Sequence, residues 1–229
     1  MSENTPSKDI KTRGIVLRRT NYGEADRILN IITPEGKFAV MAKSVRKPRS
    51  RLAGAVEMLT LSDLQLHQGR SEFAVLTGAK MIRHFNEIVK DYEKMQLVGI
   101  VLKKVSMMAE AVNNAKFFDI TLTMLEELNN GTNVSLVEAW VWLNLVRASG
   151  EEINLYRDVG GEKLSADERY DWDFAEEGFK KSDQGEYGAD EIKLLRLMVA
   201  SGMGTVKRVK ITPEMLGKVL KIAQIEAKI

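Results

Sequence analysis

The hydrophobic residues of this 229-residue chain change their spacing near residue 88. Before that point, apolar residues fall in short runs separated by glycine and proline turns, which is typical of strands. After it, Met95, Val98 and Leu102 follow the three- and four-residue spacing of one helix face. The change predicts an α+β fold, with strands in the first part of the chain and helices in the second.

The first part contains five predicted strands. Apolar residues change face between Leu61 and Leu64, which predicts a β-bulge near Ser62 and Asp63. Five short strands with turns at this spacing fit the five-stranded OB-fold barrel. The predicted strands are Arg13–Arg19, Ile28–Ile32, Phe38–Ala42, Met58–Leu66 and Glu72–Thr77.

The second part is predicted to be helical, with one interruption. Residues 136–146 are apolar on nearly all sides, so this helix is expected at the centre. Two closing helices are predicted at 192–199 and 213–225, the latter capped by Thr212. Residues 150–187 are acidic and lose the helical period, although 170–174 alternate like a strand. We therefore expect an OB-fold domain at 1–85 and a helical domain at 86–229 that carries this irregular insert.

Composition argues against several functions. The chain has no cysteine, which excludes a disulfide, a thiolate zinc site and a cysteine nucleophile. Its two histidines have no partners at catalytic or metal-binding spacing, so we expect neither an enzyme nor a metal or other cofactor. The N-terminus has no apolar core, so we expect no signal peptide, and no apolar run is long enough to span a membrane. These features predict a cytoplasmic protein that is not bound to a membrane.

Charge is segregated along the chain. Residues 1–85 hold 15 Lys and Arg against 8 Asp and Glu, whereas residues 151–191 hold 5 against 14. Five of the nine residues at 43–51 are basic and none is acidic. This run, which we call the basic loop, lies between two predicted strands, and it is expected to face water or a polyanion such as nucleic acid.

Candidate nucleic-acid contacts cluster in the first part of the chain. Pro48 is expected to keep the basic loop extended along a phosphate backbone, while strand alternation places Arg13 and Arg18 on different faces. Aromatic residues that could stack on bases are few, which favours phosphate contacts over base readout. The candidates are Arg13, Arg18, Arg19, Tyr22, Lys37, Lys43, Arg46, Lys47, Arg49 and Arg51.

Ordered motifs lie within residues 12–85. They include Arg-Gly-Ile-Val-Leu at 13–17, Tyr-Gly-Glu-Ala-Asp-Arg at 22–27 and the segment 42–57, which contains the basic loop. Together these motifs resemble the RecO family of DNA repair proteins. The resemblance implies an N-terminal OB-fold and a C-terminal helical domain, with a β-hairpin at 170–179 in the insert. It also implies binding to single- and double-stranded DNA, annealing of complementary strands and help in loading recombinase onto DNA coated with the single-stranded DNA-binding protein SSB.

The resemblance further implies two protein partners, the C-terminal tail of SSB and RecR, in the bacterial cytoplasm or nucleoid. The acidic SSB tail needs an apolar groove with a basic rim, and Lys103, Lys104 and Lys116 lie beside apolar stripes that fit this need. Many relatives carry a four-cysteine zinc site in the insert. The corresponding residues 155–172 contain no cysteine, so the acidic insert replaces the zinc finger.

Two other functions fit the same composition. An OB-fold module that binds RNA would present the same basic surface, because both nucleic acids carry phosphates. A non-enzymatic interaction scaffold would use the basic loop to bind an acidic protein. Only the motif order at 42–57 favours the recombination mediator over these alternatives.

Overall fold

A computed structural model describes residues 8–228 of the chain. Contacts divide the chain into two compact units, with the division between Gly131 and Thr132. The expectation that the N-terminus lacks a signal peptide concerns residues 1–7, which lie outside the described part. None of the described helices combines the length and apolar character that a membrane span requires.

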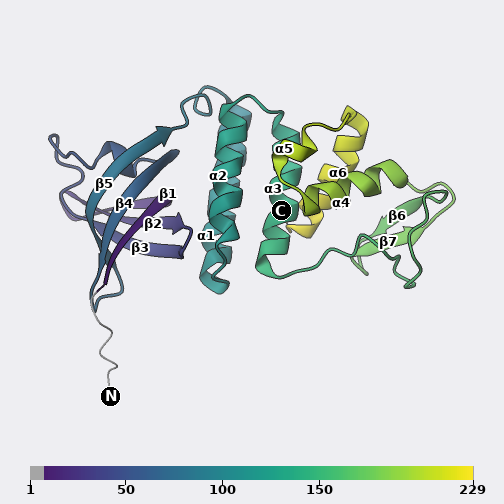
Figure 1. The fold of residues 1–229 in the computed structure, drawn as a ribbon, viewed down its shortest axis with the longest axis horizontal. Coiled ribbons are helices and arrows are strands. Elements are labelled where there is room, and N and C mark those ends of the chain that lie inside the picture. Colours follow the sequence, from purple (N-terminus) through teal and green to yellow (C-terminus); the bar gives the residue numbers. More distant parts are fainter. Residues whose placement is uncertain (1–7, 229) are drawn as a thin grey trace, which may run out of the picture. The chain divides into compact units, whose positions relative to one another are not determined.

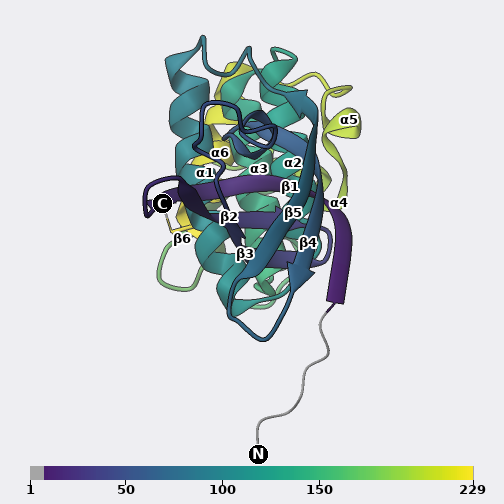
Figure 2. The same ribbon diagram turned by 90° about the vertical axis from the view of Figure 1, so that its left-hand side faces the viewer.

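Five strands of the first unit form a closed barrel (Figures 1 and 2). The order around the barrel is β1-β2-β3-β5-β4, and every pair is antiparallel except β3 with β5. The predicted five-stranded OB-fold barrel is confirmed. The strands are β1 (Lys8–Tyr22), β2 (Asp26–Thr33), β3 (Gly36–Ala42), β4 (Thr60–Gln68) and β5 (Ala74–His84).

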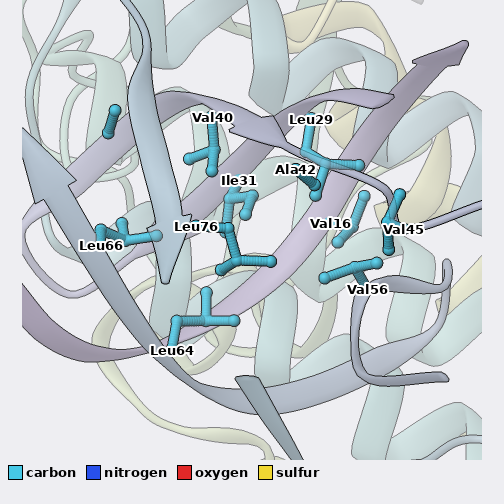
Figure 3. Close-up of a cluster of buried hydrophobic side chains, with 11 residues drawn as sticks. Val16, Leu29, Ile31, Val40, Ala42, Val45, Val56, Leu64, Leu66 and Leu76 are labelled. Carbon is cyan, nitrogen blue, oxygen red and sulfur yellow. The ribbon is translucent and has the colours of Figure 1, made fainter. Parts of the chain in front are cut away.

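The barrel interior is filled by aliphatic side chains that alternate along each strand, as Leu29 and Ile31 do on β2 (Figure 3). Val45 and Val56 belong to the connection between β3 and β4, and both are buried in the same cluster. Val56 ends a short 3₁₀ helix, Gly54–Val56. The long connection that carries the basic loop is therefore anchored to the barrel core by two valines.

The pairing of β4 with β5 can be compared with the bulge and the strand end that the sequence predicts. The β4–β5 register shifts between Leu61 and Ser62, next to the predicted bulge, but the extra residue is Ile82 on β5 and not a residue of β4. β5 continues well past its predicted end because its last residue, His84, still pairs with Thr60. The added residues include the exposed Met81 and Ile82, so the apolar alternation that predicts a strand is lost there.

Two helices complete the first unit. α1 (Tyr92–Ala111) begins at Asp91, whose carboxylate accepts a hydrogen bond from the Lys94 amide, and α2 is Lys116–Asn129. α1 contacts β1 and β3, and α2 contacts β1 and β2. Residue 85 marks the change from strands to helices, and as a domain boundary it stays a prediction.

The second unit is built around α3 (Val134–Ser149), which is buried on most sides as its sequence predicts. α3 contacts α4 and α6, and α4 contacts α5 and α6. The Thr212 hydroxyl accepts a hydrogen bond from the Met215 amide, so the predicted cap of α6 is confirmed. The remaining helices are α4 (Ala189–Ala200), α5 (Met203–Val206) and α6 (Pro213–Glu226).

The acidic insert folds around a hairpin of β6 (Tyr170–Asp173) and β7 (Gly178–Lys181). Phe179 lies at its centre and makes edge-to-face contacts with the rings of Tyr170, Trp172 and Tyr187, at centroid distances of 4.9–6.1 Å. All four rings are buried. The insert thus has an aromatic core of its own, and the predicted β-hairpin is confirmed.

Candidate nucleic-acid interface

The basic loop is clamped onto the turn between β1 and β2. The Ser44 amide donates to the Asp26 carboxylate at 2.6 Å, and the Arg46 amide donates to the Ala25 carbonyl at 2.9 Å. Val45, between them, is 1% exposed and points into the barrel core. These contacts fix the start of the loop on both sides of Val45, so the basic side chains that follow project from a defined base.

The loop folds into turns, so the expectation that Pro48 keeps it extended was wrong. The Lys47 amide donates to the Ser44 carbonyl at 3.2 Å, and the Ser50 amide donates to the Lys47 carbonyl at 2.9 Å. Pro48 is the second residue of that last turn, where its fixed φ angle suits a type I or type II turn. The loop therefore changes direction within a few residues and does not run as one extended segment.

The basic side chains of this loop face solvent. Lys43, Arg46, Lys47, Arg49 and Arg51 are all exposed. Arg46 also donates through Nη1 to the Gly23 carbonyl at 3.2 Å, which holds its guanidinium beside the β1–β2 turn. An exposed cation with spare donors in a fixed position can bind a phosphate at a smaller entropic cost than a free side chain.

A group of arginines lies next to the clamped loop. Glu57 pairs through one carboxylate oxygen with Arg19 of β1 and through the other with Arg27 of β2, the latter at 2.8 Å. Burial lowers the pKa of Arg27, and the charges of Arg19 and Arg46 lower it further. Arg19 and Arg46 therefore both lie within electrostatic range of Arg27, and one carboxylate binds Arg19 and Arg27.

Tyr22 and Arg18 lie on the outer part of β1 near this group. Tyr22 is the last residue of the strand and is 55% exposed. It directly precedes the turn to which the basic loop is hydrogen-bonded. Arg18 is exposed and pairs with Asn30 of β2, just after a register shift in β1. Tyr22 is thus placed where an aromatic ring can stack on a base beside the basic loop.

Two of the predicted residues, Arg13 and Lys37, lie against the helices of the first unit. The Arg13 guanidinium lies 6.0 Å from the centroid of the Phe118 ring on α2. The Lys37 side chain is 9% exposed, donates to the Ser106 carbonyl at 3.0 Å and pairs with Glu110, both on α1. The structure therefore separates these two cations from the residues that gather around the basic loop.

The predicted rim for an SSB tail lies on the helices of the first unit. Lys103 is exposed on α1, on the side where Ile100 and Met107 are also exposed. Lys116 is exposed at the first position of α2, and Lys104 is half-buried. Lys103 therefore has apolar neighbours of the kind such a rim needs, and the role of all three lysines stays a prediction.

Sequence reasoning missed Arg27, Glu57 and Asp26 as parts of this site. Arg27 appears within a motif of the family, but strand alternation alone does not show that it shares a carboxylate with Arg19. One signal for Glu57 was present, since it is the only acidic residue between Glu35 and Asp63. An isolated acid in a strongly basic stretch is a candidate internal counterion.

The barrel topology and the anchored basic loop define an OB-fold protein with a strongly basic surface beside the β1–β2 turn. Comparison with known families gives its relationship. The model described as "Recombination protein O N terminal" matches residues 7–85, and "Recombination protein O C terminal" matches residues 91–224. The chain belongs to the RecO family of DNA repair and recombination proteins.

Curated relatives named DNA repair protein RecO support this relationship. One from Dehalococcoides mccartyi strain CBDB1 is 37% identical over 149 residues, which is 64% of this chain and 58% of that protein. Another, from the strain designated 195, is 30% identical over 226 residues, which is 93% of this chain and 87% of that protein. A Roseiflexus protein is 33% identical over 147 residues, 64% of this chain and 52% of its own length.

Proposed function

We propose that this chain is a recombinational repair mediator that binds single- and double-stranded DNA, anneals complementary strands and helps to load recombinase onto SSB-coated DNA. The observation that carries the proposal is the basic loop, which presents five exposed cations and is held by hydrogen bonds against the β1–β2 turn, next to Tyr22, on an OB-fold barrel. Such a surface binds phosphates with little dependence on base sequence.

The proposed activity requires no covalent chemistry. Two DNA strands repel each other through their phosphates, and a basic surface that holds both strands lowers this barrier. Because the loop contacts would go to phosphates, the base edges stay free to pair. The chain would then act as a non-enzymatic annealing protein in the bacterial cytoplasm, on nucleoid DNA.

The first test is binding of a fluorescently labelled single-stranded oligonucleotide, measured by anisotropy across a salt series. Four neutralised phosphates give a log–log salt slope of about −2.8 on single-stranded DNA, so affinity falls about 50-fold between 50 and 200 mM salt. We expect the variant with alanine at all four loop positions to lose most of this dependence. Those positions are Arg46, Lys47, Arg49 and Arg51.

A matched control removes four exposed cations elsewhere. The control variant has alanine at Lys90, Lys193, Arg208 and Lys210, all of which are exposed. It changes the net charge by the same amount as the loop variant, so it reports the effect of charge alone. A loop variant that binds as tightly as the wild type, or a control that loses as much affinity, would remove the basic loop as the DNA site.

Annealing and the nature of the ligand are tested on the same samples. The chain is expected to speed pairing of complementary strands coated with SSB, and the loop variant to be slower. Competition with an RNA of the same sequence separates the mediator from an RNA-binding module. No binding to either nucleic acid at low salt, together with capture of an acidic protein, would support an interaction scaffold instead.

We propose SSB and RecR as protein partners. The α1 surface around Lys103, with its exposed apolar neighbours, is the candidate site for the acidic SSB tail. A labelled peptide with the SSB tail sequence should bind the wild type and bind more weakly when Lys103, Lys104 and Lys116 are replaced by alanine. Co-elution with RecR in size-exclusion chromatography tests the second partner.

A further inference from the structure

The pairing of Glu57 places one carboxylate across two guanidinium groups. Its Oε1 accepts from Arg27 Nη1 at 2.8 Å, and its Oε2 pairs with Arg19. Arg19 and Glu57 are 40% and 38% exposed at their side chains, whereas Arg27 is 17% exposed. Two oxygens of one anion, bridging two guanidiniums at the surface, form the arrangement that a phosphate group also adopts with arginines.

The site holds more positive charge than Glu57 neutralises. Arg46 adds a third guanidinium, and its charge and that of Arg19 both disfavour the charged form of Arg27. Three guanidinium groups around one carboxylate leave an excess of positive charge, which favours binding of a further anion.

We infer that Glu57 occupies a phosphate subsite and competes with a DNA phosphate for Arg19 and Arg27. This inference rests on the proposed DNA binding and adds a residue that opposes it. The exchange requires no unfolding, because the side chains of Glu57 and Arg19 are both accessible to solvent. With Glu57 in place, Arg19 and Arg27 are paired with its carboxylate, whereas the exposed cations of the basic loop are available to the backbone of a strand.

An internal competitor has a functional consequence for annealing. A protein that holds two strands must release the duplex after pairing, so binding that is too tight slows turnover. Glu57 lowers the net attraction at the edge of the basic loop without removing the arginines. A strand can therefore be held by more contacts at the moment when Glu57 is displaced, and released when Glu57 returns.

The test is the Glu57→Gln variant, which keeps the shape of the side chain and removes its charge. One added phosphate contact steepens the single-strand salt slope by about 0.7. We therefore expect tighter binding at 50 mM salt, with a gain that shrinks about 2.6-fold by 200 mM. The matched control is Glu176→Gln, an exposed carboxylate of the β6–β7 turn that changes the net charge equally.

A second variant shows whether the gain passes through the arginines. In Arg19→Ala/Glu57→Gln, the gain over Arg19→Ala alone should be smaller than the gain of Glu57→Gln over the wild type. Annealing by Glu57→Gln is expected to start faster and to leave more protein on the duplex product. A purely structural Glu57 predicts the opposite result, with a lower melting temperature and weaker binding.

The outcomes separate this inference from the proposed function. Binding by the wild type with no gain in Glu57→Gln, or an equal gain in Glu176→Gln, overturns the inference and leaves the proposed function standing. No binding by either protein overturns both. If Glu57→Gln does not fold, the NMR signals of the Arg19 and Arg27 Nε–H groups are followed in the wild type while the oligonucleotide is added. The inference requires both signals to shift, and unchanged signals overturn it.

Discussion

Replacement of Lys37 by methionine tests whether this lysine serves the fold or DNA. The amine is almost fully buried and donates to the Ser106 carbonyl of α1, which joins β3 of the barrel to that helix. Methionine keeps most of the aliphatic stem, so the loss is mainly this hydrogen bond and a carbonyl left without its donor. A hydrogen bond from a charged group contributes about 1.5–3 kcal/mol, so we expect the free energy of unfolding to fall by about 2 kcal/mol.

The assay is urea denaturation followed by helix content, because the three tryptophans all lie in the second unit and do not report on the contact between β3 and α1. In contrast, Glu110→Gln should change stability little, because Glu110 is largely exposed and its pair with Lys37 is screened by water. DNA binding supplies the second readout. We expect Lys37→Met to bind the oligonucleotide with the salt slope of the wild type.

Two results would refute this reasoning. A variant as stable as the wild type would show that the contact between Lys37 and Ser106 contributes nothing to the free energy of unfolding. A salt slope reduced by about 0.7, as loss of one phosphate contact predicts, would show that Lys37 contacts DNA.

Two further predictions concern the second unit. Burial, followed by the charges of Glu177 and Glu151, raises the pKa of Glu226 to about 7 from its ordinary 4.5. The folded chain therefore holds this proton more tightly than the unfolded chain, so stability should fall as pH rises from about 4.5 to 7. The Glu226→Gln variant should flatten this part of a plot of melting temperature against pH. A plot that is unchanged in the variant would contradict the assignment. A Cβ at Gly185 would lie 2.5 Å from the backbone of Tyr170, so Gly185→Ala should destabilise the insert by about 1–3 kcal/mol in urea denaturation, whereas Gly204→Ala, with open space around it, should not.

Periodicity was sufficient to predict the barrel and the helices because burial repeats regularly along each element. Leu64 and Leu66 alternate with exposed residues on β4, and α3 is buried where its sequence is apolar. The ends of strands were less predictable. The last residues of β5 are held by pairing with β4, and that pairing does not depend on their own hydrophobic pattern.

The sequence was sufficient to predict the residue types of the candidate site, but it predicted only part of their contacts. Exposed cations at 43–51 follow from composition, because five charges without partners nearby in sequence must face solvent or a polyanion. The clamp on Asp26 and the turn at Pro48 could not be predicted in the same way. Both depend on hydrogen bonds to residues whose positions are set by the closed barrel.

The α+β order, the five strands and the position of the basic loop follow from the sequence alone, because these features depend on local spacing and charge. Which cations lie together depends on the tertiary fold. Lys37 and Arg46 are both basic residues for which the sequence shows no partner. Barrel closure and the packing of α1 place Lys37 against Ser106 and Glu110, whereas Arg46 lies beside the β1–β2 turn. Contacts between residues distant in sequence require the chain to be folded, and they assign Glu57 to Arg19 and Arg27.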